Sequence, residues 1–165
     1  MESTIYINNT QKQLNHEGGE LLLDSLRNHG YHEVKRGCEE GECGACMVLL
    51  DGKPVNACRV FTASTAGHEI TTVKGIGDIH RPHAIQQAFV ESGAVQCGFC
   101  TPALVLSTWH LLKDNPSPND EEILQALDGV LCRCTGYVKI IDAVKIAAEK
   151  MEQSTPEVME DTRNK

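Results

Sequence analysis

The sequence predicts an α+β fold in two parts, with a small mixed domain over residues 1–77 and an all-α domain of four helices over residues 78–152. A polar tail is expected over residues 153–165. Two observations favour this division. Apolar residues form short strand-like runs up to residue 78 and follow helical spacing after Ile79. The eight cysteines of the 165-residue chain also separate into two sets of four, one in each part.

The first part begins with a predicted hairpin, because Thr4–Ile7 and Gln11–Asn15 flank the turn residues Asn8 and Asn9. Leucines at positions 21, 22, 23 and 26 form the apolar face of a helix that ends at Gly30. Three further strands are expected, and the first two are joined by an Asp-Gly turn at residues 51 and 52. These strands are Met47–Leu50, Pro54–Val60 and Glu69–Val73.

The second part contains four predicted helices, each bounded by residues that favour helix ends. They span Pro82–Ser92, Thr101 to the residue before Pro116, Ser117–Asp128 and Thr135–Met151. Thr101 and Thr135 are expected as helix caps that directly follow Cys100 and Cys134, at helix N-termini where the helix dipole favours a thiolate. In the fourth helix, the residues expected to face the core are Ile141, Val144 and Ala148.

Charge and hydropathy exclude several classes of partner. The chain has 15 Lys plus Arg against 23 Asp plus Glu, a net charge of -8, which argues against nucleic acid and anionic membrane surfaces. No apolar run approaches the roughly 20 residues that span a bilayer. The first residues, Met1 to Asn9, have neither the basic nor the apolar segment of an export signal. The sequence therefore predicts a cytoplasmic protein.

Eight cysteines in a reducing compartment are expected to bind metal rather than to form disulfides. The first set has the C-x4-C-x2-C…C spacing of plant-type 2Fe-2S ferredoxins. Glycines at positions 37, 41 and 44 allow a tight loop whose amides reach the sulfurs. The predicted ligands of a first 2Fe-2S cluster are Cys38, Cys43, Cys46 and Cys58.

The second set combines a C-x2-C pair with a C-x-C pair. The C-x2-C spacing also occurs in zinc sites and thiol redox sites, whereas C-x-C is unusual for structural zinc. This spacing favours iron and sulfide, with zinc as the alternative. The predicted ligands of the second 2Fe-2S cluster are Cys97, Cys100, Cys132 and Cys134.

Three segments together carry a family resemblance over residues 3 to about 150. They are GCEEGECGAC at 37–46, VQCGFCTP at 95–102 and LCRCTGY at 131–137. With these segments the chain resembles the small iron–sulfur subunit, or N-terminal part, of molybdenum hydroxylases such as xanthine dehydrogenase and aldehyde oxidoreductase. The resemblance implies a β-grasp ferredoxin-like domain followed by a four-helix domain, each binding one 2Fe-2S cluster.

The resemblance also implies a function, that of the electron-transfer subunit of a xanthine dehydrogenase-type enzyme. Electrons would pass from molybdopterin on a large partner subunit through the helical-domain cluster and then the ferredoxin-domain cluster to FAD on a medium subunit. Gln96 and Cys134 are the residues implied to contact molybdopterin. The implied assembly is a hetero-oligomer, with a dimer of heterotrimers as one form. No nucleotide-binding or hydrolase motif is present, so no substrate site is expected on this chain. The alternatives are a free-standing two-cluster ferredoxin and a zinc-binding structural module.

Overall fold

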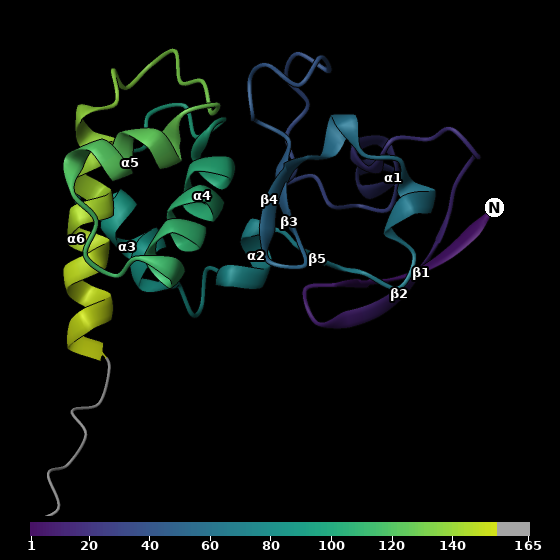
Figure 1. Cartoon of the computed structure of the whole chain (residues 1–165), viewed down its shortest axis with the longest axis horizontal. Helices are drawn as coiled ribbons and strands as arrows, with labels where there is room; N and C mark the ends of the chain where they lie inside the picture. Colours follow the sequence, from purple (N-terminus) through teal and green to yellow (C-terminus); the bar gives the residue numbers. More distant parts are fainter. Residues whose placement is uncertain (155–165) are drawn as a thin grey trace, which may run out of the picture.

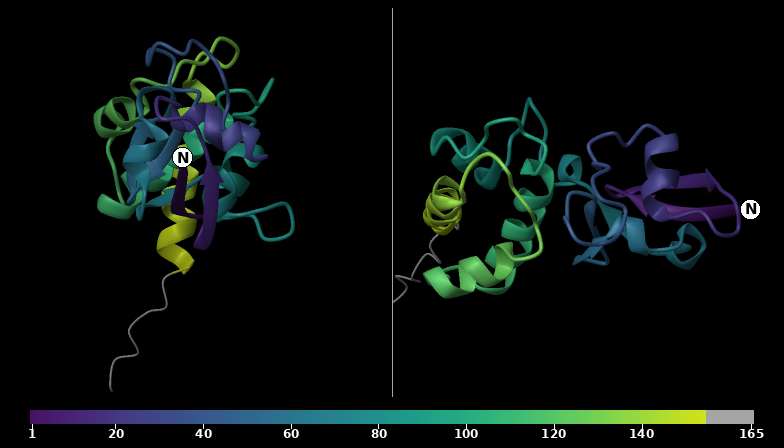
Figure 2. Two further views of the ribbon diagram at one scale, coloured as in Figure 1. Left: turned by 90° about the vertical axis from the view of Figure 1, so that its right-hand side faces the viewer. Right: turned by 90° about the horizontal axis from the view of Figure 1, so that it is seen from above.

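A computed structural model describes residues 1–154 of the chain, which form two halves lying side by side (Figure 1). The first half contains a five-stranded sheet with a short helix, and the second contains helices only. Seen from above, in the right-hand view of Figure 2, the halves are again separate, with the four-residue helix α2 (Val73–Ile76) between them. The predicted order of an α+β part followed by an all-α part is therefore confirmed.

The sheet has the strand order β2-β1-β5-β3-β4. Strand β1 pairs parallel with β5, and the other neighbouring pairs are antiparallel. The strand bounds are Glu2–Ile7 for β1, Thr10–Asn15 for β2, Met47–Leu50 for β3, Lys53–Asn56 for β4 and Glu69–Thr71 for β5. Helix α1 (Leu22–Asn28) buries its leucines against this mixed sheet. The arrangement is that of the predicted ferredoxin-like half.

Both predicted hairpin turns are present. Asn8 and Asn9 have φ angles of 51° and 62°, and Asp51 and Gly52 have 49° and 79°. Positive φ at both central residues is the geometry of the turn that matches the twist of two antiparallel strands, and Asn, Asp and Gly tolerate it best. The turn residues therefore specify the pairing of β1 with β2 and of β3 with β4.

The strand predicted at Pro54–Val60 is wrong in its second half. Strand β4 ends at Asn56, and the chain continues as a 3₁₀ turn over Ala57–Arg59. This turn buries Cys58 and brings it to Cys46, which a continued strand would not do. Strand β5 also ends earlier than predicted, because Val73 begins α2.

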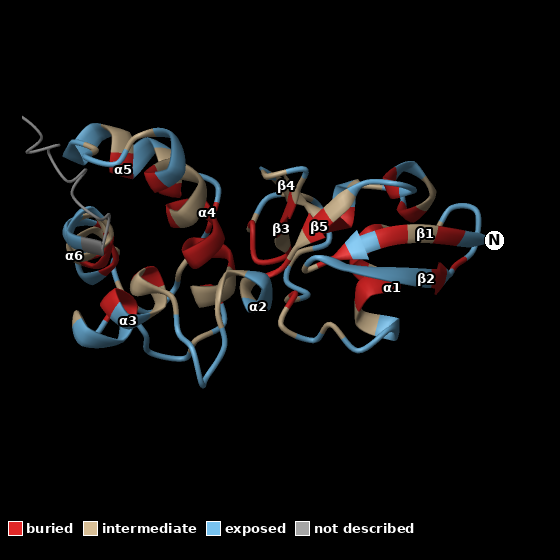
Figure 3. Cartoon of the chain, turned by 90° about the horizontal axis from the view of Figure 1, so that it is seen from below, coloured by how far each residue is buried: buried red, intermediate tan, exposed pale blue. Residues whose placement is uncertain are grey.

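The helical half contains the four predicted helices: α3 (Ala84–Glu91), α4 (Thr101–Asp114), α5 (Asp120–Leu127) and α6 (Val138–Ser154). Side-chain caps begin two of them. His83 caps α3 and Asn119 caps α5, each in a reciprocal capping box with the residue three positions on. The inner faces of the helices enclose a separate apolar core, and Figure 3 shows the buried residues concentrated there and in the sheet.

Helix α6 begins three residues later than predicted, at Val138. Tyr137 has a φ of 67°, so the helix cannot extend back through it. Cys134 therefore lies in a loop and not at a helix N-terminus, whereas Cys100 lies at the N-terminus of α4 as expected. The N-cap of α4 is Cys100 itself and not the predicted Thr101, which is the first helical residue. The buried face of α6 comprises Ile140, Ala143, Val144 and Ala147, so the predicted inward residues Ile141 and Ala148 are only partly buried.

Two boundaries of the predicted organisation remain predictions. Val73 and Ile76 of α2 pack against the helical core although they precede residue 78. At the other end, Gln153 and Ser154 still belong to α6, and residues 155–165 of the predicted tail lie outside the described residues. Within residues 1–154, no helix combines the length and apolarity that crossing a membrane requires.

Candidate iron-sulfur sites

The loop over residues 37–46 places backbone donors at two sulfurs of the first cysteine set. The amide of Cys43 donates to the Cys38 sulfur at 3.3 Å, and the amide of Glu40 donates to the same sulfur at 3.4 Å. The Cys38 amide in turn donates to the Cys43 sulfur at 3.4 Å. These amide donors, that of Glu40 foremost, lower the pKa of Cys38 to about 6. The loop therefore favours negative charge on sulfur.

The other two cysteines of this set lie deeper. Cys46 and Cys58 are 3% and 1% exposed, and their thiol groups contact each other. Burial raises the pKa of Cys46 to about 12. Asn56, at the end of β4, donates its side-chain amide to the Gly41 carbonyl at 2.9 Å and so fixes the loop above the buried pair.

Gly37 is required where the loop closes on the sulfurs. A Cβ atom at Gly37 would lie 2.5 Å from the Cys43 sulfur, which is closer than any real contact. The glycine expected from the sequence to allow a tight loop therefore has a specific role, since it leaves room for a predicted ligand atom.

The second cysteine set is formed by the loop before α4 and the loop before α6. The sulfurs of Cys97 and Cys134 lie 3.6 Å apart, and both residues are exposed. Cys100 is buried and interacts with the thiol of Cys132, and burial raises the pKa of Cys100 to about 12. All four predicted ligands of the second set are thus brought together, with one exposed pair and one inner pair.

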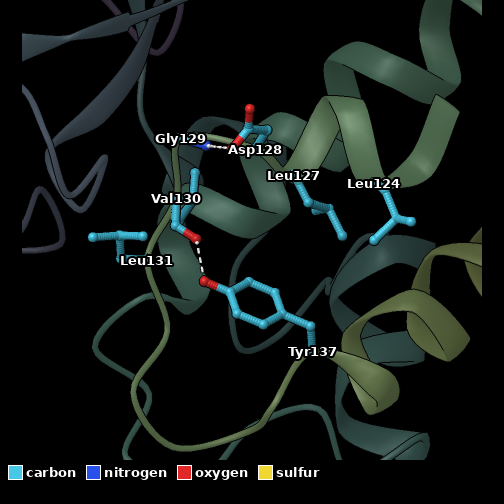
Figure 4. A pocket seen from close by; sticks show the side chains of 7 residues that line it. All are labelled: Leu124, Leu127, Asp128, Gly129, Val130, Leu131 and Tyr137. Carbon is cyan, nitrogen blue, oxygen red and sulfur yellow. Dashed lines mark hydrogen bonds between the residues drawn. The ribbon is translucent and has the colours of Figure 1, made fainter. Parts of the chain in front are cut away.

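Cys132 is held at both its sulfur and its amide. The Thr135 hydroxyl donates to the Cys132 sulfur at 3.0 Å, and the Thr135 amide approaches it at 3.5 Å. Burial acts to raise the pKa of Cys132, but these hydrogen bonds outweigh it and lower that pKa. The Cys132 amide donates to the Tyr137 hydroxyl at 2.8 Å, and this hydroxyl donates to the Val130 carbonyl at 3.0 Å (Figure 4).

The arrangement of sulfurs in each half is compatible with a two-iron cluster. The thiols meet in pairs, with Cys38 near Cys43, Cys46 near Cys58, Cys97 near Cys134, and Cys100 near Cys132. A 2Fe-2S cluster takes four thiolates, two on each iron, so two such pairs in each half fit one cluster.

A backbone contact joins the two cysteine loops. The amide of Leu131, the residue before Cys132, donates to the carbonyl of Cys43 at 2.9 Å. The loops can approach this closely because residue 44 is glycine, with a φ of 65°, and a Cβ there would lie 2.1 Å from the Gly129 carbonyl oxygen. Sequence reasoning missed this contact, since neither Gly44 nor Gly129 carries a pattern that identifies its tertiary neighbour.

The two residues implied to contact molybdopterin lie at one exposed edge. Gln96 is exposed and directly precedes Cys97, whose sulfur contacts Cys134. Exposed apolar side chains occur in the same two loops, at Val95, Phe99 and Leu131. The roles of Gln96 and Cys134 toward molybdopterin stay predictions.

Comparison with known proteins identifies both halves. Residues 5–69 match a family described as a 2Fe-2S iron–sulfur cluster binding domain, and residues 72–145 match a family described as a [2Fe-2S] binding domain. The chain thus consists of two 2Fe-2S-binding domains, each with its own set of four cysteines. The zinc alternative is thereby set aside.

Individual relatives span both domains. The nicotinate dehydrogenase small FeS subunit of Eubacterium barkeri is 46% identical over 87% of this chain and 92% of its own length. The xanthine dehydrogenase iron–sulfur-binding subunit of Escherichia coli O157:H7 is 44% identical over 84% of this chain and 88% of its own. The aldehyde oxidoreductase structure from Desulfovibrio gigas superimposes with a TM-score of 0.89 at 39% identity. It covers 94% of this chain, but the chain covers 18% of that longer protein.

The two paired-thiol sites, the two matched domains and the agreement with whole small subunits all lead to one assignment. The chain belongs to the small 2Fe-2S subunits of the xanthine dehydrogenase/aldehyde oxidoreductase family, the electron-transfer subunits of molybdenum hydroxylases.

Proposed function

We propose that this chain passes single electrons from a molybdopterin-containing large subunit to a flavin-containing medium subunit. Electrons enter at the exposed edge that carries Gln96, Cys97 and Cys134 and leave the helical half through Cys132. They then cross to Cys43 and leave by the loop of residues 37–46. When bound, each 2Fe-2S group accepts and releases one electron by the change of one iron between ferric and ferrous.

The hydrogen bond between the Leu131 amide and the Cys43 carbonyl is the observation that carries this proposal. It connects the residue next to Cys132 with a predicted ligand of the other site through peptide groups alone. The exposed pair Cys97 and Cys134 belongs to the same four-sulfur set as Cys132 but remains accessible to a partner. The helical-domain site thus has an exposed edge where electrons can enter and an inner edge that faces the ferredoxin-domain site.

The proposed partners follow from the relatives. Two relatives, the nicotinate dehydrogenase small FeS subunit and the nicotine 6-hydroxylase small subunit of Paenarthrobacter nicotinovorans, are small subunits by name, which supports a larger partner for this chain. A large molybdopterin-binding subunit, a medium FAD-binding subunit and a dimer of heterotrimers are the proposed assembly. A cytoplasmic location is proposed as well, because eight cysteines that ligate iron have to stay reduced, and a reducing compartment preserves them.

Substitution of Gln96 tests the entry edge. In the assembled complex, Gln96→Leu should slow the reduction of both iron–sulfur sites by substrate several-fold, because a polar contact next to Cys97 is lost. The electron paramagnetic resonance spectra of both sites should keep their wild-type shape. Stopped-flow absorbance measures the rate.

Gln13→Leu is the matched control, because Gln13 is an exposed glutamine on β2, in the other half of the molecule. It should leave the reduction rate unchanged. Wild-type reduction kinetics in Gln96→Leu would remove Gln96 from the entry edge. A native mass near 18.1 kDa, that of the chain alone, would instead support a free-standing ferredoxin.

A further inference from the structure

The two cysteine sets differ in the kind of donor that reaches their sulfurs. In the first set, the hydrogen bonds to sulfur from outside the cysteine side chains come from peptide amides, such as those of Glu40 and Cys43. In the second set, a side-chain hydroxyl also donates, from Thr135 to the Cys132 sulfur at 3.0 Å. Among the described residues, this is the one non-cysteine side chain that donates to a predicted ligand sulfur.

The direction of this hydroxyl group is fixed by its neighbours. The Thr135 oxygen accepts a hydrogen bond from the Tyr137 amide at 3.3 Å. A hydroxyl has a single proton to donate, so with its oxygen engaged by that amide the proton is directed to the Cys132 sulfur. Tyr137 is in turn held by its own hydroxyl, which bridges the Cys132 amide and the Val130 carbonyl.

We propose that the Thr135 hydroxyl raises the reduction potential of the helical-domain site by its hydrogen bond to the Cys132 sulfur. Reduction adds one electron, converts one ferric ion to ferrous and breaks no bond to sulfur, and the hydroxyl keeps its proton. The added negative charge spreads onto the ligand sulfurs, where a hydrogen bond becomes stronger. The bond therefore stabilises the reduced state more than the oxidised state. Thr135 and Cys132 are half-buried, so water screens this effect less than at an exposed site.

This assignment makes Thr135 a positioning residue that acts through Cys132. It rests on the proposed ligation of iron by Cys132 but not on the direction of electron flow. The two proposals therefore fail separately. If the proposed function is right, a Cys132 variant loses the signal of the second iron–sulfur site. The role of Thr135 is tested separately, by the reduction potential of a site that is still intact.

Thr135→Val and Thr135→Ser provide the test in the iron-loaded full-length chain. Valine removes the hydroxyl with little change of shape, and serine keeps it. A redox titration followed by electron paramagnetic resonance should show a lower midpoint potential at the helical-domain site in Thr135→Val. At a fixed solution potential, we expect its reduced-to-oxidised ratio to fall about tenfold, which is about 59 mV for one electron. Thr135→Ser should restore the wild-type value.

Thr101→Val is the matched control. Thr101 follows Cys100 as Thr135 follows Cys134, but within the described residues its hydroxyl makes no hydrogen bond to a sulfur. This variant should leave both potentials unchanged. The ferredoxin-domain site should also keep its potential in every variant.

Two outcomes would overturn the proposal. The first is a wild-type midpoint potential in Thr135→Val with a normal two-site spectrum. The second is a failure of both Thr135→Val and the smaller Thr135→Ala to load iron while Thr135→Ser loads normally. That result would make the hydroxyl a requirement for folding.

Discussion

The peptide amides next to the Cys38 sulfur change the acidity of this single thiol. The amides of Glu40 and Cys43 stabilise its thiolate and lower its pKa to about 6, whereas burial raises the pKa of Cys46 to about 12. Two cysteines of one set thus differ widely in acidity. Their acidity follows from the local backbone and from depth in the fold rather than from their spacing in the sequence.

In the metal-free chain, Cys38 should be alkylated faster than Cys46. Its thiolate predominates above pH of about 6 and is protonated below it, so its alkylation rate should rise through that pH and level off by pH 8. Cys46, which is buried and stays a thiol throughout this range, serves as the internal control. Mass spectrometry of peptides after brief treatment with iodoacetamide measures both rates. Equal labelling of the two residues at pH 7 would contradict the expected difference.

At the scale of elements, the helices and hairpins were predictable and the cysteine loops were not. Asn8 and Asn9 predicted the first turn because their preference for positive φ is local. The sequence placed the start of α6 too early, because Tyr137 adopts a positive φ. In this conformation the Tyr137 hydroxyl accepts a hydrogen bond from the Cys132 amide, a tertiary contact that local sequence does not reveal. The 3₁₀ turn at Ala57–Arg59 replaced a strand for the same reason, since it brings Cys58 to Cys46.

The candidate sites follow the same distinction. Cysteine spacing predicted which four sulfurs would meet in each half, and the structure brings both sets together. Thr135 was expected to cap a helix, whereas its hydroxyl donates to a sulfur. The repeat of Cys-Thr at 100–101 and 134–135 was the signal available, but only the fold distinguishes the two threonines.

Gly44→Ala tests the contact between the two cysteine loops. Residue 44 combines a φ of 65° with a Cβ position 2.1 Å from the Gly129 carbonyl oxygen, so alanine must separate the loops. We expect a loss of about 2–3 kcal/mol in unfolding free energy from strain and lost contact. Electron transfer between the two sites should also slow, because the hydrogen bond from Leu131 to Cys43 lengthens. Chemical denaturation and flash-induced reduction measure the two effects.

Gly93→Ala separates the two causes of strain. Gly93 has a φ of 70°, but a Cβ there would meet no atom within 4 Å. The unfolding free energy of this variant should fall by about 1 kcal/mol because of its backbone conformation. Its rate of electron transfer between the two sites should stay at the wild-type value. A slowed rate in Gly93→Ala, or a wild-type rate in Gly44→Ala, would refute the proposed role of the close approach.

At the scale of the whole molecule, each half has its own apolar core, and each core is small. Domains of this size bury little apolar surface relative to the entropy that folding costs, and they commonly depend on a metal or a crosslink. In the helical half, the cysteine loops lie between helices and connect α3 to α4 and α5 to α6. Four thiolates bound to one 2Fe-2S cluster would hold these helix pairs together.

Removal of iron should therefore unfold the helical half. Hydrogen exchange should show loss of amide protection throughout α4 and α6, and the thermal unfolding temperature should fall. Restored protection after addition of iron and sulfide is the control for irreversible damage. A metal-free chain with unchanged thermal unfolding would contradict this dependence.

The bond between Leu131 and Cys43 has a consequence for how the sequence can change over generations. Both of its partners are peptide groups, so replacement of the leucine side chain leaves the donor and the acceptor in place. Proline at position 131 would remove the donor, and any side chain at position 44 would push the acceptor away. The sequence around this hydrogen bond can therefore change widely while the contact between the two cysteine loops is kept.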